Sequence, residues 1–338
     1  MTRQFNPTQM VIEAVDRIRP IIRHTILDPS PYYAQRSALG PRSTPGPRSA
    51  SGQRSGADVY FKCENLQHTG SFKARGALNK ILSLSAEERA KGIVTASTGN
   101  HGAACAFAMQ QVGANGIVFV PHTAIATKLE AIRRLGAEIR TFGTDSAETE
   151  VHARAYAEEQ GMTYVPPYND PYVIGGQGTI AVELLDDLPD LNAVFVSVGG
   201  GGLIGGIASY IKSVRPEVQV FGCSPENSQV MAQSVQAGEL LDLPSLPTLS
   251  DGTAGGVEAG SITFPLCRDF VDQYISVTEE EIAASLREFM GAHHMLIEGS
   301  AAVAIAAFLK AADQLKESQV AIVLCGANIS LETLKEIL

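Results

Sequence analysis

A lysine near the start of a predicted helix is the first residue whose position could serve chemistry. Lys73 lies in the run TGSFKARGA at residues 69–77. Ser71 is a suitable N-cap, and it would place Lys73 in the first turn, where the helix dipole disfavours a positive charge. A lysine in such a partly apolar, electropositive place loses its proton more readily, and a neutral amine is what Schiff-base chemistry requires. An ordinary surface lysine is the alternative that this run leaves open.

A second run, STGNHG at residues 97–102, follows an apolar segment and opens a predicted helix. It brings the hydroxyls of Ser97 and Thr98 together with the free backbone N–H groups of a helix start. That combination suits a carboxylate ligand. An ordinary helix cap would produce the same pattern.

The third feature is the glycine run VGGGGLIGG at residues 198–206. Consecutive glycines are costly in conformational entropy, but they let backbone N–H groups surround a phosphate at a helix N-terminus. Gly200, Gly202 and Gly205 also match the dinucleotide fingerprint, and Glu226 lies about 20 residues further on, where a ribose-binding acid would stand. This run alone therefore also permits a nicotinamide-dependent oxidoreductase.

A fourth run, LCGAN at residues 324–328, directly follows an apolar segment. Taken alone, Cys325 is best interpreted as a buried thiol that packs like a small hydrophobic side chain.

Short apolar segments alternate with helical patterns from residue 57 onward, which predicts an α/β fold with parallel sheets covered by helices. Predicted strands lie near 59–64, 92–97, 116–121, 137–142, 193–198, 218–223 and 319–325. Predicted helices lie near 72–84, 101–111, 126–135, 145–160, 226–237, 279–292, 299–311 and 331–338, and a further helix follows the glycine run and ends near Ser213. Ligands of such folds bind where strands end and helices begin, and all four runs fall at such junctions.

Length and composition narrow the class of protein. The 338 residues suit two lobes, and the net charge of −10 argues against a nucleic-acid partner. The five cysteines are odd in number and lack C-x-x-C spacing, which argues against a disulfide framework or a cysteine zinc site. We find no signal pattern at the N-terminus and no apolar run long enough to span a bilayer, so we expect a cytoplasmic protein with no membrane partner.

Residues 36–56 differ from the rest because arginine, serine and glycine recur there every six residues. The segment contains a single large apolar residue, Leu39, and cannot bury enough surface to offset its ordering entropy. We interpret it as a flexible insertion between a helix that ends near Ser37 and a strand that begins near Asp58. A basic docking arm is the alternative.

Together and in this order, the four runs resemble the fold-type II pyridoxal-5'-phosphate (PLP) enzymes of the serine/threonine dehydratase group, which includes serine racemase. The resemblance extends from about Arg23 to the C-terminus. It implies a two-lobed fold, with residues 1–81 and 170–338 in a large PLP-binding domain and 82–169 in a small substrate-binding domain. It also implies a homodimer or a higher homo-oligomer.

The resemblance further implies roles for individual residues. Lys73 would hold PLP as a Schiff base and move the Cα proton, and Asn100 would bond the ring hydroxyl of the cofactor. Cys325 would face the pyridine nitrogen. The substrate carboxylate would meet Ser97, Thr98, Gly99 and His101, and the phosphate would meet Gly199, Gly200, Gly201, Gly202 and the Leu203 N–H. The expected reaction is loss of water and then ammonia from a β-hydroxy amino acid such as threonine or serine.

Three departures from the family pattern refine this hypothesis. Thr98 stands where racemases carry a serine acid/base, and a β-branched hydroxyl is stiffer, which favours elimination over racemisation. Ser224 and Val230 replace the two carboxylates of a metal site found in some relatives, so we expect no metal there. The segment SDGTAGGVE at 250–258 resembles that of dehydratases of hydroxyectoine utilisation, in which Glu258 would meet a cationic substrate tail; a solvated loop acid is the alternative.

Two further functions stay open at this stage. One is an oxidoreductase that uses NAD(P), and the other is a binding protein of the PLP fold without catalytic activity. Glu298, just before a predicted helix, is expected either near the cofactor or as a helix cap.

Overall fold

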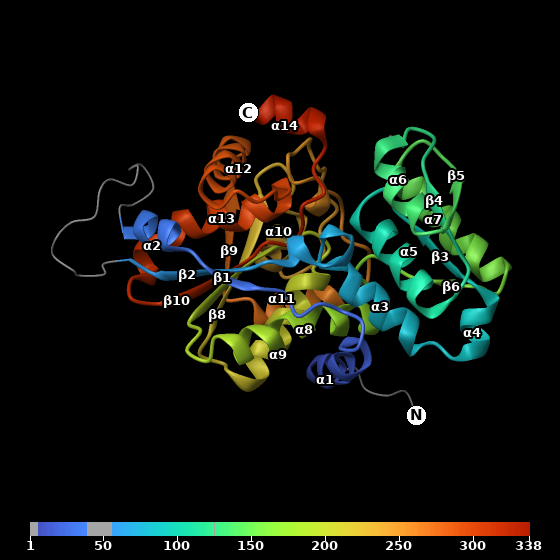
Figure 1. Cartoon of the computed structure of the whole chain (residues 1–338), viewed down its shortest axis with the longest axis horizontal. Coiled ribbons are helices and arrows are strands. Elements are labelled where there is room, and N and C mark those ends of the chain that lie inside the picture. Colours follow the sequence, from blue (N-terminus) through green and yellow to red (C-terminus); the bar gives the residue numbers. More distant parts are fainter. Residues whose placement is uncertain (1–5, 39–55, 125) are drawn as a thin grey trace.

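The computed structural model describes residues 6–38, 56–124 and 126–338, which form two sheets that lie side by side (Figure 1). The large sheet has the strand order β1-β2-β10-β7-β8-β9. Its strands are β1 (Leu27–Pro29), β2 (Asp58–Lys62), β7 (Ala193–Ser197), β8 (Gln219–Pro225), β9 (Gln273–Val277) and β10 (Gln319–Val323). Only β1 runs antiparallel to its neighbour, so the sheet is mostly parallel, as the apolar strand segments predict.

Helices cover both faces of the large sheet, which explains why its central strands are apolar on both sides. Helix α13 (Gly299–Ala311) packs directly on β7, β8, β9 and β10, and α12 (Glu279–His293) packs on α13. On the other face lie α8 (Pro171–Asp187) and α9 (Gly202–Val214), with α1 (Pro7–Ile18) outside them (Figure 1). Phe195 and Phe221 stack in the core between these layers.

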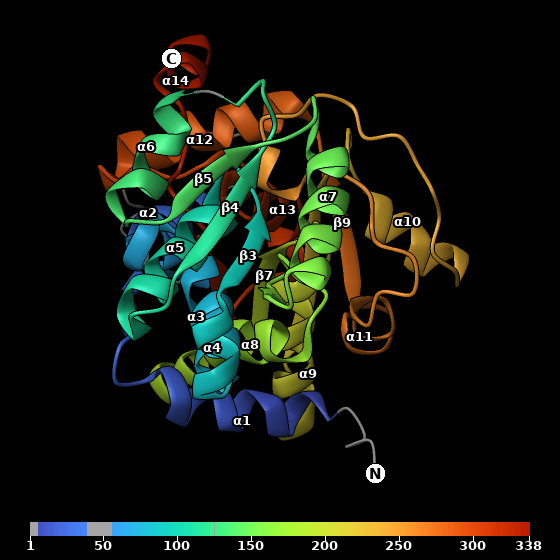
Figure 2. The ribbon, with the colours of Figure 1, turned by 90° about the vertical axis from the view of Figure 1, so that its right-hand side faces the viewer.

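The small sheet has the order β5-β4-β3-β6, and all its strands are parallel (Figure 2). Its strands are β3 (Ile93–Ala96), β4 (Gly116–Val120), β5 (Glu138–Thr141) and β6 (Thr163–Tyr164). Its helices are α4 (Ala86–Lys91), α5 (Asn100–Val112), α6 (Ala126–Arg134) and α7 (Ser146–Glu159). Helix α3 (Lys73–Ser83) packs on α5 of this half and on α8 of the other, so it connects the two sheets.

The expected α/β fold is confirmed, and the predicted elements lie within a few residues of the observed ones. The remaining helices are α2 (Pro31–Ala38), α10 (Val230–Ala237), α11 (Thr263–Phe270) and α14 (Leu331–Ile337). The helix expected from 226 begins four residues later, because β8 extends to Pro225.

The elements missing from the sequence prediction are helices α1, α4, α8 and α11 and strands β1, β6 and β9. Helix α8 is buried on most of its surface, so it lacks the apolar stripe by which an amphipathic helix is recognised. Glycines at 175, 176 and 178 further lower its helix propensity. A start signal was nevertheless present, since Asp170 caps the helix and Pro171 occupies its first turn.

The predicted insertion at 36–56 needs a correction at its first end. Helix α2 continues to Ala38, and the Arg36 guanidinium pairs with Glu288 on α12 at 3.1 Å. Arg36 is therefore part of the packed fold and does not belong to a docking arm. The rest of the repeat, 39–55, lies outside the residues that the structure describes.

Candidate active site

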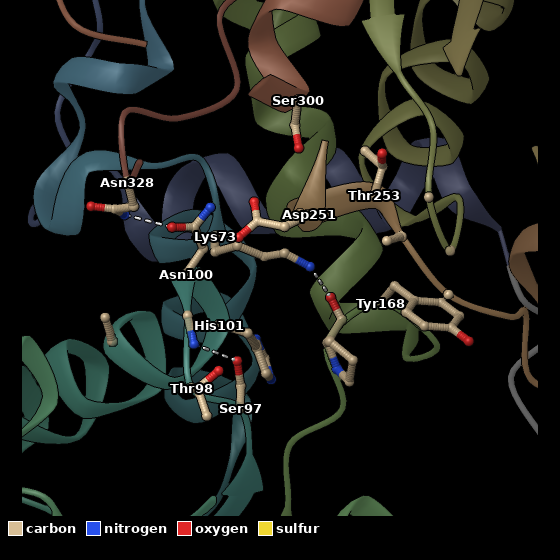
Figure 3. A pocket seen from close by; sticks show the side chains of 18 of the residues that line it. Lys73, Ser97, Thr98, Asn100, His101, Tyr168, Asp251, Thr253, Ser300 and Asn328 are labelled. Atoms are coloured by element: carbon tan, nitrogen blue, oxygen red, sulfur yellow. Dashed lines mark hydrogen bonds between the residues drawn. The ribbon is translucent and has the colours of Figure 1, made fainter. Parts of the chain in front are cut away.

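A cavity of about 1390 Å³ opens at the carboxyl ends of β3, β7 and β10. It is the junction that the fold class predicts for a ligand. Every residue that the family resemblance assigns to the cofactor or to the substrate carboxylate lines this cavity: Lys73, Ser97, Thr98, Gly99, Asn100, His101, Gly199, Gly200, Gly201, Gly202, Leu203 and Cys325. Segments more than 250 residues apart in the chain thus meet in one place (Figure 3).

Lys73 begins α3 and extends its amine across the cavity, where Nζ donates to the Pro167 carbonyl at 2.7 Å (Figure 3). Burial lowers the pKa of this amine from 10.5 to about 8, although nearby acidic groups oppose the shift. A fraction of Lys73 is therefore neutral near physiological pH, as covalent chemistry at a carbonyl requires. The expected causes were an electropositive helix start and partly apolar surroundings; the main cause is desolvation.

The predicted capping of α3 is wrong in one respect. The N-cap is Phe72, and Ser71 is a fully buried residue that forms a β-bridge with Gly326. The Phe72 N–H donates to the Cys325 carbonyl at 3.0 Å. The segment before Lys73 is thus tied to the segment after β10, and this pairing brings Lys73 and Cys325 to the same cavity.

The turn between β3 and α5 carries the second group of predicted residues. The Gly99 N–H donates to Ser97 Oγ at 3.2 Å, and Gly99 is the N-cap of α5 (Figure 3). His101 is 4% exposed, and its Nε2 lies 3.0 Å from the Val165 carbonyl. Burial and the nearby Lys73 lower the pKa of His101 to about 3, so its ring is neutral and holds the turn in place. The turn offers backbone N–H groups of a helix start to a ligand in the cavity.

The glycine run forms a tight turn between β7 and α9, and close packing excludes side chains there. A Cβ on Gly200 or Gly202 would lie within 2.8 Å of Tyr168, and one on Gly199 would lie 2.9 Å from the backbone of Thr253. Gly201 has φ of +83° and is the N-cap of α9. The backbone N–H groups at this helix start can therefore approach an anionic group closely.

A buried polar cluster occupies the wall between α5, α13 and the end of β10. Glu298 occupies the N-cap position of α13 and is 3% exposed, but its side chain makes no capping hydrogen bond to the helix. Its carboxyl accepts from Asn100 Nδ2 at 3.1 and 3.0 Å and from the Asn328 N–H at 3.1 Å. The Cys325 thiol donates to the same carboxyl at 3.7 Å. Of the two expectations for Glu298, proximity to the proposed cofactor site is the one that this geometry supports.

The segment 251–258 covers one side of the cavity, and Glu258 attaches it to the small-sheet half. Glu258 Oε2 accepts from Arg154 Nη2 at 3.2 Å and from Asn169 Nδ2 at 2.8 Å. Its N–H donates to Tyr168 Oη at 2.9 Å. Glu258 is thus a paired carboxylate that is still 38% exposed and lines the cavity, and its existing contact with Arg154 weakens the interpretation drawn from the hydroxyectoine branch.

The residues present fit PLP on three structural grounds. An amine of lowered pKa, a glycine turn that a Cβ would block, and an amide at Asn100 all face one cavity. The dinucleotide hypothesis fits less well, because Glu226 is exposed and does not line the cavity. Within 6–38, 56–124 and 126–338, no group of three or more His, Cys, Asp or Glu side chains is arranged to hold a metal.

Some residues of the site were missed or left without a role by the sequence analysis. Pro167 and Tyr168 follow β6, the two-residue strand that no periodicity could reveal, and Asp251 begins the short 3-10 helix Asp251–Thr253. Asn328 belongs to the LCGAN run but received no role. Its position at the end of the same post-strand turn as Cys325 was the available signal.

The amino-acid sequence of this chain is similar to those of several known proteins. The family model described as "Pyridoxal-phosphate dependent enzyme" matches residues 39–326. A protein of Thermotoga maritima named L-threonine ammonia-lyase is 42% identical over 84% of this chain and 70% of its own length. A protein of Geobacter sulfurreducens with the same name is 37% identical over 97% of this chain and 77% of its own.

Solved structures agree with these sequence relatives. The processed form of threonine deaminase isoform 2 from Solanum lycopersicum superposes with a TM-score of 0.88 at 30% identity, over 99% of this chain and 93% of that one. Maize serine racemase superposes with a TM-score of 0.87 at 31% identity, over 97% and 95% of the two chains. Among the residues that the structure describes, no helix combines the length and apolar character needed to cross a membrane.

Proposed function

The chain belongs to the family of pyridoxal-phosphate dependent enzymes, and from this premise we propose that it removes water and then ammonia from a β-hydroxy amino acid such as L-threonine or L-serine. Dehydration leaves an enamine, and its tautomer takes up one water as ammonia leaves, so the net products are a 2-oxo acid and ammonia. The observation that carries the proposal is the convergence of the Lys73 amine, the 97–101 turn and the 199–202 turn on one cavity. The names of the relatives support threonine as the first substrate to test.

PLP, when bound, supplies an electron sink for the bond pair at the substrate Cα. In the proposed division of roles, Gly199 to Gly202 and the Leu203 N–H hold the phosphate group. Ser97, Thr98, Gly99 and His101 hold the substrate carboxylate and fix the Cα hydrogen relative to Lys73. Proximity and orientation of this kind account for a large part of enzymatic rate enhancement.

Lys73 takes the Cα proton in its neutral form and carries it toward the leaving β-hydroxyl, since a pKa of about 8 allows both protonation states near neutral pH. Burial raises the pKa of the Cys325 thiol, so a neutral group rather than a carboxylate stands at that position. A carboxylate there would keep the pyridine nitrogen protonated and strengthen the electron sink, whereas a neutral thiol does so less well, which favours prompt expulsion of the β-hydroxyl. The stiff hydroxyl of Thr98 favours the same outcome over racemisation.

The test is a spectroscopic substrate screen of the purified, PLP-loaded protein. Threonine, serine, 3-hydroxyaspartate and hydroxyectoine-derived amino acids are offered, and release of 2-oxo acid and ammonia is followed. We expect turnover of threonine or serine, which is lost in Lys73→Ala. A protein that binds PLP but turns over none of these amino acids would be a binding protein, and the proposal would be wrong.

Three narrower expectations accompany the proposal. A homodimer or higher homo-oligomer, a cytoplasmic location, and the assignment of residues 82–169 as a substrate-binding domain all stay predictions. The four-stranded sheet of residues 93–164 supports the last of them, since it carries the 97–101 turn.

A further inference from the structure

The side-chain amide of Asn100 has its orientation set by partners on both of its ends. Its Oδ1 accepts from Asn328 Nδ2 at 2.5 Å, and its own Nδ2 lies 3.1 and 3.0 Å from the two carboxyl oxygens of Glu298. An amide nitrogen carries two hydrogens. The two oxygens of one carboxylate lie too close together to take both diverging N–H bonds, so a single N–H serves Glu298. The other N–H is available to a ligand in the cavity that Asn100 lines (Figure 3).

The orientation of Asn328 is determined in the same way. Its Nδ2 donates to the Thr69 carbonyl at 2.9 Å as well as to Asn100. A backbone carbonyl can only accept, so the amino end of Asn328 must face Thr69 and Asn100. Thr69 has φ of +63°, an uncommon backbone conformation that turns this part of the chain just before Lys73.

The other end of the chain of hydrogen bonds is fixed by Glu298. Its carboxyl also accepts the Asn328 N–H, which holds it beside Asn100. Gly326 makes this approach feasible, because a Cβ there would lie 2.7 Å from the Glu298 carboxyl. The relay of Thr69, Asn328, Asn100 and Glu298 therefore starts at the Asn328 amino group, which donates to the Thr69 carbonyl and to Asn100 Oδ1. It continues from Asn100 Nδ2 to the Glu298 carboxyl, so it has an acceptor at each end.

We propose that Glu298 and Asn328 are positioning residues that hold Asn100 as a hydrogen-bond donor toward the ring oxygen of the cofactor. The inference rests on the proposed function only for the identity of that cofactor. A donor aimed at an aromatic oxygen stabilises its deprotonated form and lowers its pKa. Without the relay, the Asn100 amide can rotate by half a turn and present Oδ1, which repels the same oxygen.

The decisive substitution is Glu298→Gln, which preserves the shape but replaces an acceptor-only group by an amide that can also donate. Wild-type and variant proteins are loaded with PLP, and the absorbance of the bound cofactor is followed against pH. We expect the midpoint of the absorbance change to rise by about one unit and the dissociation constant for PLP to increase about tenfold.

Asn328→Asp is the second variant, since it keeps the shape of the side chain and turns its donating end into an acceptor. It should shift the midpoint in the same direction as Glu298→Gln, because an aspartate cannot donate to the Asn100 oxygen. The control is Glu332→Gln, the same substitution at an exposed carboxyl that lines the same cavity. It should leave the midpoint and the dissociation constant unchanged.

The titratable groups that act on Glu298 and Lys73 are Cys325, Asp251, Cys105 and Glu150, and all are kept in these variants. A midpoint in both variants within about 0.2 units of the wild type overturns the inference, as does a wild-type protein that takes up no PLP. Absence of amino-acid turnover with a shifted midpoint would instead refute the proposed function alone. If Glu298→Gln does not fold, Asn328→Asp decides by the same midpoint.

Discussion

At the scale of single residues, the site keeps an amine where a charge is poorly solvated. Lys73 has a pKa of about 8 in the folded chain, against 10.5 for a solvated lysine, because protein surrounds it. Below about pH 8 both the folded and the unfolded chain carry the proton, so the folded chain bears the full desolvation cost. The same desolvation favours the neutral, reactive form of the amine and lowers the free energy of unfolding of the protein.

Lys73→Met, which keeps the length of the side chain without the charge, should therefore stabilise the cofactor-free protein. We expect a gain on the order of 2 kcal/mol at pH 7 in the free energy of unfolding, measured by urea denaturation. The unfolded wild type holds more protons between pH 8 and 10.5, so its stability rises with pH there and the gain diminishes. Parallel pH profiles of the two proteins across that window would contradict this account.

At the scale of elements, the turn between β7 and α9 leaves no room for side chains at its four glycines. Gly201 combines a left-handed backbone with close neighbours, since a Cβ there would lie 2.8 Å from Cys267 Sγ and 2.9 Å from Met231 Cε. Gly238, at the end of α10, has nearly the same φ, 81° against 83°, but nothing within 4 Å of its Cβ position. Substitutions at these two glycines therefore distinguish the effect of backbone strain from the effect of crowding.

Gly201→Ala should weaken PLP binding at least about tenfold, because the turn must move to admit a methyl group where the phosphate is expected to bind. Gly238→Ala should leave PLP binding unchanged while it lowers the melting temperature by a few degrees, the result of strain alone. Both are measured by PLP titration and thermal unfolding. Equal PLP affinity in the two variants would argue against a phosphate site at this turn.

At the scale of the whole molecule, α3 connects the two halves, and its rear face is anchored by buried charges. Arg75 is fully buried and donates to Glu64 at 2.7 and 2.8 Å and to Glu183 at 2.6 and 2.8 Å. Lys62, also fully buried, pairs with Glu183 at 2.6 Å. Arg75 lies two residues after Lys73, roughly 200° around the helix, so the anchor and the reactive amine occupy opposite faces.

Arg75→Met should lower the free energy of unfolding by about 3–5 kcal/mol, because it leaves two buried carboxylates without their main counter-charge. The matched control is Arg134→Met, which removes an exposed arginine paired with Glu130 at 3.4 Å and should cost less than about 1 kcal/mol. Urea denaturation of both variants checks the difference. Similar losses in the two would show that the buried network contributes little to stability.

Much of the protein could be predicted from the sequence, because the strong signals are local. The alternation of apolar strands and helices depends on neighbouring residues, and it predicted the α/β fold and most elements. The four runs at strand ends identified residues that do meet in one cavity. The glycine run could be recognised from the sequence alone, because four consecutive glycines are hard to explain except by close approach of the backbone to a ligand or a neighbouring segment.

Only the tertiary structure decided how those residues are oriented. The cap at Phe72 rather than Ser71, the pairing of Glu258 with Arg154, and the hydrogen-bond relay through Asn328, Asn100 and Glu298 join segments more than 100 residues apart. Helix α8 was not predicted because a helix that is buried on most sides lacks the periodicity of an amphipathic helix. Residue types and local periodicity are written in the sequence, whereas desolvation and the direction of hydrogen bonds arise only when distant segments pack together.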